Sequence, residues 1–310
     1  KTCYQDIMSA GCAGSIVFTW QDEWFKRTWN TMAYTDLTKT PYWSDVQTNE
    51  QFFGVLAFDP GDEKSVCYVD GDVSEWTADD QIQLTDTPYG QLSLAYKYDE
   101  KYLYLYVNKE NYNPQTDKLW IPLDTTPKTG SRRCDGIARS FERPADFVLI
   151  LDGMENSKLV VQKRYEALRA IYSHRVYFED AYLNVPPKDT SEFVDINLVL
   201  QIPDDPHDEL ANVKIDVAET YPTGLLRHGN ANPESPDFDS LADFMIQGDT
   251  IEIRLPWSLL NFLNPSEMMI HDDYYEHYGI EGLKISEIYA GVGLSADGAT
   301  PIPMTDLPLK

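Results

Sequence analysis

The sequence of 310 residues is 42% hydrophobic and 13% aromatic, so it can bury a core as one large domain or as two ordinary ones. Its 51 acidic and 25 basic side chains give a formal net charge of −26, which would repel nucleic acid and anionic membrane surfaces and suits neutral sugars or cations better. The longest apolar runs, such as Phe147 to Leu151, are far shorter than the roughly 20 residues of a membrane-spanning helix, so we expect no membrane insertion by this chain.

The start of the chain and its cysteines bear on processing. No charged stretch followed by an apolar one precedes Cys3, and the chain begins at Lys1, so we expect a piece of a longer protein with any targeting signal upstream. The four cysteines show neither CxxC spacing nor the density of a disulfide scaffold. We expect most of them to be buried thiols: Cys3, Cys12, Cys67 and Cys134.

Residues 1 to 58 have the pattern of a strand followed by a helix. The apolar run Ser15 to Trp20 predicts a buried strand, and Thr19 with Asp22 three residues later is typical of a capping box. A helix should follow, because large apolar side chains recur at helical spacing: Trp20, Trp24, Phe25, Trp29 and Met32. A second apolar cluster, Phe52 to Phe58, ends at the turn signal Asp59 to Gly61, which indicates a domain boundary.

From about residue 66 the hydrophobic period changes to two, with short strands between turn residues. Tyr102 to Val107 is the clearest strand, and Leu119 to Asp124 is expected to be its hairpin partner. Further strands are expected at Phe147 to Leu151, Lys158 to Arg164, Asp195 to Leu200 and Ile251 to Leu255, and a helical turn at Trp257 to Leu263. The sequence predicts a mainly β fold, an antiparallel β-sandwich behind a small N-terminal α/β segment.

Spaced motifs in residues 66 to 310 resemble family 9 carbohydrate-binding modules and related ligand-binding sandwiches. An opening "DG…W" turn is matched by Val69, Asp70, Gly71 and Trp76. A "D…YLYV" strand is matched by Tyr98, Asp99 and Tyr102 to Val107, and an acidic-ended strand by Asp117 with Leu119 to Asp124. The late "E-x-x-IPW" element is matched by Ile251 to Trp257, which begins its motif at Glu252. The resemblance implies a sugar-binding sandwich of jelly-roll or DOMON-like type over residues 66–310.

The stretch from Gly14 to Trp24 resembles the last strand and helix of a glycoside hydrolase (β/α)8 barrel. This resemblance implies that residues 1–60 are the remnant of a barrel-type domain, with the catalytic carboxylates on earlier strands outside this chain. Together the two parts are similar to the C-terminal region of large bacterial proteins that carry a family 2 glycosyltransferase or a glycosidase-like barrel. The expected partners are a glycan and an upstream catalytic domain of the same polypeptide, and the compartment stays open, with the extracellular or cell-surface side favoured.

Aromatic side chains are the candidates for carbohydrate binding. Tyr102, Tyr104 and Tyr106 alternate along one strand, and Trp120 would join them if the expected hairpin has the right register. Such rings can stack on the apolar faces of pyranose sugars. The alternative is that they pack against the N-terminal segment or a covering loop, whereas Trp76 and Trp257 are expected in the core.

Acidic clusters are candidates for structural calcium, because Ca²⁺ prefers carboxylate and carbonyl oxygens. The two clusters are Asp70, Asp72 and Glu75, and Asp237 with Asp239. Neither follows the EF-hand pattern, and solvated loop carboxylates are the alternative explanation. A calcium ion here would fix a loop and take no part in chemistry.

Two further groups favour structural roles. Asp22 and Glu23 end the predicted barrel-like strand, but adjacent residues point apart and Asp22 already serves as a cap. His271 and His277 flank three acids, yet residues six apart on a helix point in different directions, so a surface turn is expected there rather than a zinc site.

These observations favour a non-catalytic carbohydrate-binding accessory region of a larger bacterial protein, with no catalytic residue assigned in this chain. A first alternative is part of a glycoside hydrolase or glycosyltransferase catalytic unit. A second is a structural spacer or docking domain. An exposed strip of Tyr and Trp favours binding, two carboxylates in a cleft roughly 5 to 10 Å apart favour hydrolysis, and a covered aromatic face favours the scaffold.

Overall fold

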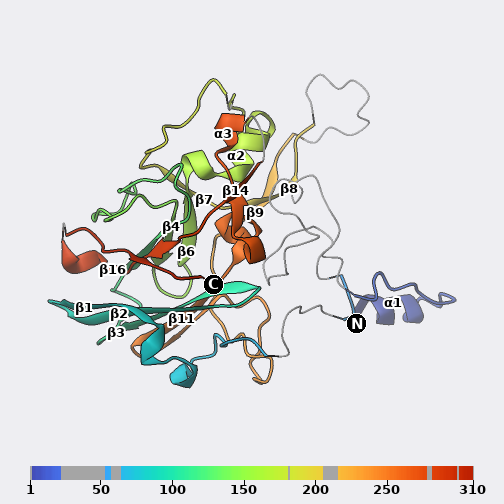
Figure 1. Ribbon diagram of the computed structural model, residues 1–310. Helices are drawn as coiled ribbons and strands as arrows, with labels where there is room; N and C mark the ends of the chain where they lie inside the picture. Colours follow the sequence, from blue (N-terminus) through green and yellow to red (C-terminus); the bar gives the residue numbers. More distant parts are fainter. Residues whose placement is uncertain are drawn as a thin grey trace.

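The body of the protein is two antiparallel sheets, seen one above the other in Figure 1. The computed structural model describes residues 2–21, 53–56, 64–180, 182–204, 216–277, 281–298 and 300–309. Helices α2 (Ala167–Tyr172) and α3 (Tyr274–His277) lie at the end of the sandwich away from the five-stranded sheet (Figure 1). The predicted fold class, a mainly β antiparallel sandwich, is confirmed.

The first sheet has five strands in the order β1-β2-β3-β11-β10. Its strands are β1 (Gln81–Thr87), β2 (Gly90–Tyr98), β3 (Tyr102–Lys109), β10 (Phe244–Gln247) and β11 (Thr250–Pro256). The second sheet has seven strands in the order β17-β15-β4-β5-β6-β7, with β16 also paired to β4. Its strands are β4 (Leu119–Asp124), β5 (Phe147–Leu151), β6 (Lys158–Gln162), β7 (Phe193–Asp195), β15 (Tyr289–Ala290), β16 (Gly293–Leu294) and β17 (Thr305–Asp306).

Smaller elements complete the described part of the chain. A three-stranded sheet contains β12 (Phe262–Asn264), β13 (Met269–His271) and β14 (Gly282–Lys284), and a two-stranded one contains β8 (Leu198–Gln201) and β9 (Glu219–Tyr221). Helix α1 (Thr2–Ser9) lies in the N-terminal segment. Among the described helices, none is both long and apolar enough to cross a membrane.

The main core fills the space between the two sheets. It is formed by the apolar side chains that alternate onto the inner face of each strand. On β3, Leu103, Leu105 and Val107 are completely buried on the face toward the second sheet. Strands β4 and β5 are buried along almost their whole length, which places them at the centre of the second sheet. Side chains from both sheets interdigitate in one cluster, as expected for a sandwich.

Most predicted strands exist, with one error of pairing. Phe147 to Leu151 is β5 as predicted, while Asp195 to Leu200 divides between β7 and β8. The prediction that Leu119 to Asp124 pairs with β3 is wrong, because β3 pairs with β2 and β11 and β4 pairs with β5. The connection after β3 crosses from one sheet to the other, a choice that alternation within a strand does not encode.

The late helical turn is shorter than predicted. It covers Trp257–Leu260, and Asn261 then adopts a left-handed backbone conformation with φ of 60°. Strand β12 begins at the next residue. Trp257 is 3% exposed and belongs to the main core, as predicted, whereas Trp76 is half-buried against a smaller cluster.

The described part of the N-terminal segment contains parallel backbone pairing. A parallel bridge joins Gln21 to Leu56, and Thr19 donates its backbone N–H to the carbonyl of Phe53 and accepts one from Val55. The predicted strand at Ser15 to Trp20 is therefore reduced to these contacts. The predicted helix over residues 24–32, the Asp22 cap, Glu23 and the boundary at residues 59–61 lie outside the described residues.

The cysteines divide between the two parts of the chain. Cys67 and Cys134 are buried in the sandwich, whereas Cys3 and Cys12 are exposed in the N-terminal segment. All four are free thiols, in agreement with the expectation of no disulfide framework, and burial is found for two of the four.

Candidate functional site

The motif residues around Glu252 converge on the outer side of the five-stranded sheet. Glu252 lies on β11 opposite Tyr106, and one of its carboxylate oxygens accepts the backbone N–H groups of Gly71 at 2.7 Å and Asp70 at 3.2 Å. Its other oxygen accepts the indole N–H of Trp76 at 2.8 Å. Gly71 has φ of +89°, which a side chain would strain, and this turn brings both N–H groups to the carboxylate. We call these residues the Glu252 cluster.

A second set of motif contacts joins β3 to the turn after β11. Asp99 accepts the backbone N–H of Tyr102 and the hydroxyl of Tyr104, both at 2.9 Å. The indole N–H of Trp257 donates to the Asp99 carbonyl at 2.8 Å. The residues that carry the family resemblance therefore fix the start of β3 and the end of β11 against each other, which is a structural role.

The expected aromatic strip is covered. Tyr102, Tyr104 and Tyr106 do share one face of β3, but Tyr102 is 6% exposed and Tyr104 is 2% exposed, packed with Cys67 in a small cluster. Tyr106 stacks on Trp76, with ring centroids 5.2 Å apart. Residues 64–80 thus cover this face, as the alternative packing explanation anticipated.

Trp120 does not join the tyrosines. It lies on β4 in the other sheet, is 6% exposed, and packs in a cluster with Phe141, Val148 and Ile302. The prediction that it shares a surface with Tyr102 was wrong because it depended on a β3–β4 hairpin. Its role here is packing of the outer face of the seven-stranded sheet.

The first expected calcium group is not gathered around a common point. Asp70 accepts the backbone N–H of Asp72 at 2.8 Å and the side-chain amide of Asn232 at 2.7 Å. Asp72 accepts the N–H of Ser74, as the N-cap of a short helix, and Glu75 accepts the N–H of Tyr68. These oxygens are used by protein donors, so within the described residues the group forms a turn rather than a coordination shell.

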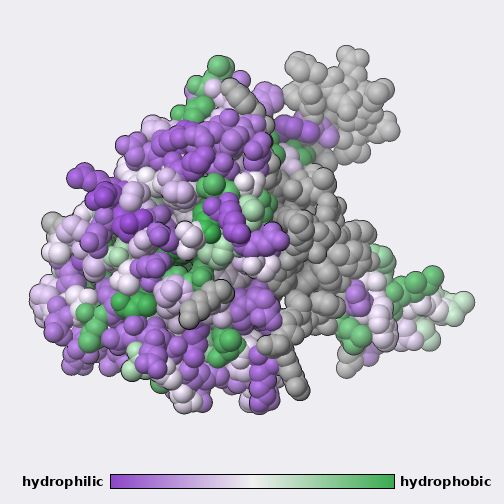
Figure 2. Space-filling model, in the orientation of Figure 1, coloured by the Kyte–Doolittle hydropathy of each residue, from purple (hydrophilic) through white to green (hydrophobic). Residues whose placement is uncertain are grey.

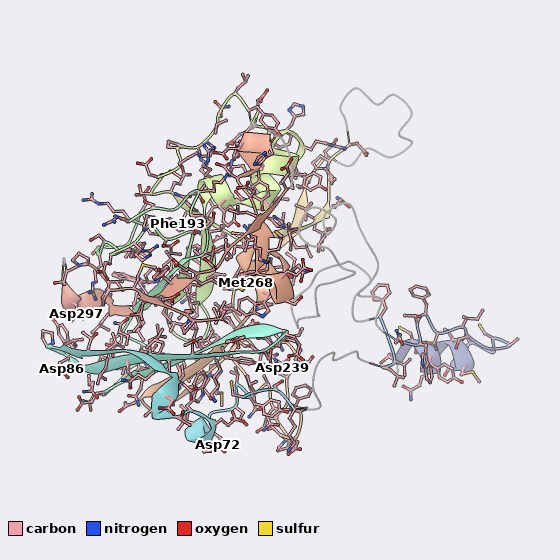
Figure 3. The ribbon with its side chains drawn as sticks, in the orientation of Figure 1. Asp72, Asp86, Phe193, Asp239, Met268 and Asp297 are labelled. Atoms are coloured by element: carbon pink, nitrogen blue, oxygen red, sulfur yellow. The ribbon has the colours of Figure 1, made fainter. Side chains whose placement is uncertain are left out.

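The second expected calcium group is likewise dispersed. Asp239 accepts the N–H of Leu241 and forms an ion pair with Arg227 at 2.6 Å. Asp237 is on the exposed turn before it, where its N–H donates to Ser235. Asp72 and Asp239 both lie on the five-stranded-sheet side of the molecule (Figure 3). Calcium binding by Asp70, Asp72, Glu75, Asp237 or Asp239 stays a prediction.

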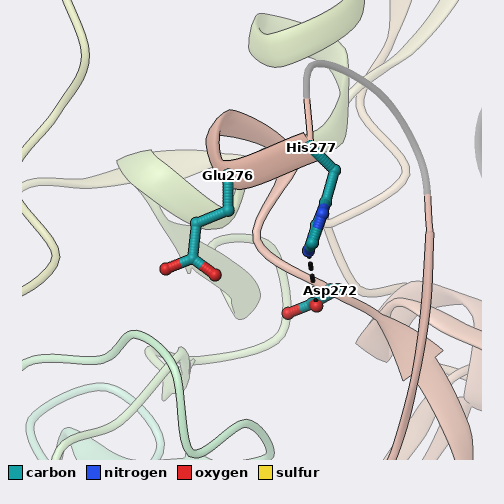
Figure 4. A group of neighbouring side chains, drawn as sticks. All are labelled: Asp272, Glu276 and His277. Atoms are coloured by element: carbon teal, nitrogen blue, oxygen red, sulfur yellow. Dashed lines mark hydrogen bonds and ion pairs between the residues drawn. The ribbon is translucent and has the colours of Figure 1, made fainter.

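The structure gathers a different charged group at the opposite end of the sandwich. Among the described residues, only Asp272, Glu276 and His277 bring three metal-binding atoms within 4.8 Å of one another. The Nε2 atom of His277 is 2.9 Å from Asp272, and all three side chains project from α3 and the turn before it (Figure 4). Two lysines from distant loops complete the group. We call these five residues, Asp272, Glu276, His277, Lys128 and Lys188, the α3 cluster.

The lysines hold the two carboxylates of the α3 cluster. The ammonium group of Lys128 is 2.9 Å from Glu276 and 3.3 Å from Asp272, and Lys188 forms an ion pair with the other oxygen of Glu276. The hydrogen bonds from Lys188 and Lys128 lower the pKa of Glu276 to about 2. Burial alone would raise the pKa of Asp272, but the Asp273 N–H, His277 and Lys128 outweigh it and lower this pKa.

These contacts decide what the α3 cluster can do chemically. The three ligand types could hold a divalent cation, but the Lys128 ammonium already lies between the two carboxylates and offsets their charge. With lowered pKa values, Asp272 and Glu276 are ionised at neutral pH. The cluster therefore offers hydrogen-bond donors and acceptors and carries no carboxylic acid proton at pH 7.

Buried contacts hold α3 in place. Asp273 accepts the N–H of Tyr275 at 3.1 Å and two guanidinium bonds from Arg164, at 3.0 and 2.8 Å. His271 is completely buried and bonded to the Tyr274 hydroxyl, while His277 is exposed. The expected surface turn is found only at its later end, because His271 to Tyr275 are buried.

Aromatic rings lie next to the α3 cluster. The ring of Tyr275, the neighbour of Glu276, is 8% exposed and contacts the ring of Tyr182 edge-on, with centroids 6.3 Å apart. Tyr182 is 45% exposed, and Phe178, four residues earlier, is 77% exposed. Arg164 lies over the Tyr275 ring at 5.3 Å. An exposed aromatic ring thus contacts the residue before Glu276, in contrast to the covered face of β3.

Sequence reasoning missed this combination for an identifiable reason. Asp272 and Glu276 are four residues apart, a spacing that places them on one side of a helical turn and was available as a signal. Lys128 and Lys188 come from loops more than 80 residues away in the sequence, and no local pattern connects them to α3. Tyr182 lies in a segment whose apolar residues recur at neither helical nor strand spacing.

No protein family model matches the sequence, and neither a curated protein nor a solved structure is similar to it. The function therefore has to be inferred from the geometry of the chain itself.

Proposed function

We propose that this chain is a non-catalytic carbohydrate-binding region and that it binds sugar at the α3 cluster and the adjoining Tyr182 ring. The observation that carries the proposal is the 45% exposed ring of Tyr182, which contacts the ring of Tyr275, the residue before the charged Glu276 on the same helix. A pyranose ring presents an apolar C–H face to an aromatic side chain and hydroxyl groups around its edge to polar ones. The face of β3, where sugar binding was expected, is covered.

The charged side chains suit hydroxyl recognition. Lys188 is about half exposed, Lys128, Glu276 and His277 are each about a third exposed, and together they present donors and acceptors. Because ion pairs already fix these side chains, a sugar hydroxyl would meet groups whose conformational freedom is reduced before binding. Charged partners also make stronger hydrogen bonds than neutral ones.

The protonation of the carboxyl groups favours binding over glycoside hydrolysis. A glycosidase needs one carboxylic acid that keeps its proton and can reach the glycosidic oxygen. Burial raises the pKa of Glu252 and of Asp146 to about 7, but these side chains are 1% and 0% exposed and accept protein N–H groups. Glu276 is about a third exposed and Asp272 is 7% exposed, and both have lowered pKa values, so neither keeps a proton for a glycosidic oxygen at neutral pH.

The proposal extends to a larger carbohydrate-active protein of bacterial type, with an upstream catalytic domain as partner. The parallel pairing of residues 19–21 with residues 53–56 supports it, because parallel strands normally belong to α/β sheets covered on both faces. In this segment Ile16 is 99% exposed and Trp20 is 70% exposed, and hydrophobic side chains gather on its surface in Figure 2. The family 9 resemblance supports the same assignment for the sandwich.

A structural spacer is the second candidate function, and the covered tyrosine face of β3 favours it. In that case the sandwich holds the N-terminal segment and its neighbours in place without binding sugar. Limited proteolysis near Pro60 addresses how the two parts relate. Rapid release of a stable sandwich with a degraded N-terminal piece would contradict docking of residues 1–58 onto it.

The test of sugar binding is a glycan array with the full chain, followed by calorimetric titration of the best ligand. Replacing Tyr182 with Ala should weaken binding about tenfold, because ring stacking contributes roughly 1 kcal/mol beyond buried area. The matched control is Tyr89→Ala, since Tyr89 is 52% exposed at the β1–β2 turn in the other sheet. That variant should bind like the parent.

The outcomes separate the two candidate functions. Binding that depends on Tyr182 and not on Tyr89 supports a sugar site at the α3 cluster. A parent protein that is silent across the array contradicts the proposal and leaves the spacer. Equal losses in both variants would also contradict it, since they would indicate diffuse aromatic contact rather than a site.

A further inference from the structure

Among the residues that the structure describes, the hydroxyl group of Tyr275 has no hydrogen-bond partner. The residue is 8% exposed, and its hydroxyl oxygen is buried and makes no hydrogen bond. Burial of an unbonded hydroxyl costs free energy, so native proteins seldom retain such a group without a reason. Tyr274, its neighbour in the chain, is bonded to His271, so this part of the fold otherwise satisfies its polar groups.

The surroundings of this hydroxyl are polar but already internally paired. Arg164 is bound twice by Asp273, and Arg169 lies 2.9 Å from Glu166 and 2.5 Å from Glu179. The charges of Arg169, Glu166, Arg164 and Asp273 act on Tyr275. Because each cation there has a carboxylate partner, the hydroxyl does not face a net charge that would select an ionic ligand.

We infer that the Tyr275 hydroxyl is a ligand-binding group for an uncharged sugar, forming a hydrogen bond to one of its hydroxyls beneath the Tyr182 ring. The inference rests on the proposed function and names the substrate class for the same site. A phenolic hydroxyl can both donate and accept, which matches a sugar hydroxyl. A uronate or sulfated glycan would instead place an anion beside Glu166, Asp273 and Glu276 and meet the overall charge of −26.

Because the hydroxyl is buried, a sugar reaches it only after a neighbouring side chain moves, and we take that side chain to be the exposed Tyr182. The Tyr182 ring contacts the Tyr275 ring edge-on and is itself 45% exposed, so a rotamer change of Tyr182 can open the contact without breaking the sandwich. The residue after it, Leu183, is 81% exposed, and Asp180 accepts the backbone N–H groups of both Tyr182 and Leu183. The sugar would then exchange the ring–ring contact for stacking on Tyr182.

The experiment compares Tyr275→Phe with Tyr112→Phe in the full chain. Tyr112 is the matched control, because it too is 8% exposed, has a buried hydroxyl without a partner, and lies in the connection after β3. Each variant removes one unbonded oxygen, so both should melt at or above the parent temperature in calorimetry. The probes are uncharged cello-, xylo- and manno-oligosaccharides, with oligogalacturonate as the anionic comparison.

We expect Tyr275→Phe to raise the Kd for the uncharged oligosaccharide about tenfold and Tyr112→Phe to leave it unchanged. Parent-like binding by Tyr275→Phe would overturn the inference and leave the proposed function standing. Preference of the parent for oligogalacturonate would overturn the substrate class, and a lower melting temperature for Tyr275→Phe would show that the hydroxyl has an internal partner. A parent that binds no saccharide removes the proposed function and this inference together.

Discussion

The Glu252 cluster and the α3 cluster use the same kind of side chain in opposite ways. Glu252 is 1% exposed, accepts three N–H groups, and has its pKa raised to about 7 by burial. Glu276 lies at the surface between two ammonium groups, which lower its pKa to about 2. Burial determines the pKa of Glu252, whereas the neighbouring ammonium groups determine the pKa of Glu276.

The difference shows which acids build the fold and which are open to a ligand. In the Glu252 cluster every carboxylate oxygen is directed at a turn or an indole, so its function is to join strands. In the α3 cluster the Glu276 carboxylate is about a third exposed, and the ring of the preceding residue, Tyr275, contacts the exposed Tyr182. The residues that carried the family resemblance belong to the first group, whereas the best ligand-binding candidates belong to the second.

The largest expected effect on stability comes from removing the carboxylate at the centre of the Glu252 cluster. Replacing Glu252 with Ala leaves the N–H groups of Asp70, Gly71 and Trp76 without their acceptor, and we expect a loss of about 2 to 4 kcal/mol in the free energy of unfolding in urea. The control is Glu267→Ala, which removes an exposed carboxylate and should change stability by less than about 0.5 kcal/mol. Equal effects in both variants would contradict the distinction between the clusters.

The second expected effect is a dependence of stability on pH. The folded pKa of Glu252 lies above its unfolded value of 4.5, so its protonated form stabilises the native state fully below pH 4.5, and this contribution disappears as the pH rises through about 7. Asp146 behaves in the same way. The parent should therefore lose stability between pH 5 and pH 8.

Glu252→Gln is the variant that isolates this contribution, because the amide resembles the protonated acid and does not titrate. The difference in unfolding free energy between parent and variant should change by about 2 kcal/mol across that range. Urea unfolding at several pH values measures it. A difference that stays constant from pH 5 to pH 8 would show that Glu252 titrates at its ordinary pKa.

The smallest expected effect on stability comes from removing an ion pair in the α3 cluster. Replacing Lys188 with Met removes an exposed ion pair with Glu276 and should cost less than about 1 kcal/mol of stability. The pKa of Glu276 should rise toward its ordinary value, which carboxyl NMR titration measures. The control is Lys158→Met, whose ion pair with Asp195 lies elsewhere and should leave Glu276 unaffected. A large loss of stability on removing Lys188 would place the α3 cluster among the structural elements.

Much of the fold could be predicted from local sequence patterns. The alternation from Tyr102 to Val107 gave β3 and its two faces correctly, and the apolar run Phe147 to Leu151 is β5 residue for residue. The candidate site could not be predicted in the same way. Trp120 appeared suitable for stacking, but its exposure depended on which sheet received β4.

The sequence by itself determined the period of the strands, the turn at Gly71 and the acidic balance of the surface, because these follow from local geometry and composition. Only the tertiary structure decided that residues 64–80 cover the tyrosines of β3 and that Lys128, Lys188 and Tyr182 meet α3. Strand pairing and loop placement depend on the packing of whole sheets. A site assembled from distant loops is therefore encoded only in the folded chain.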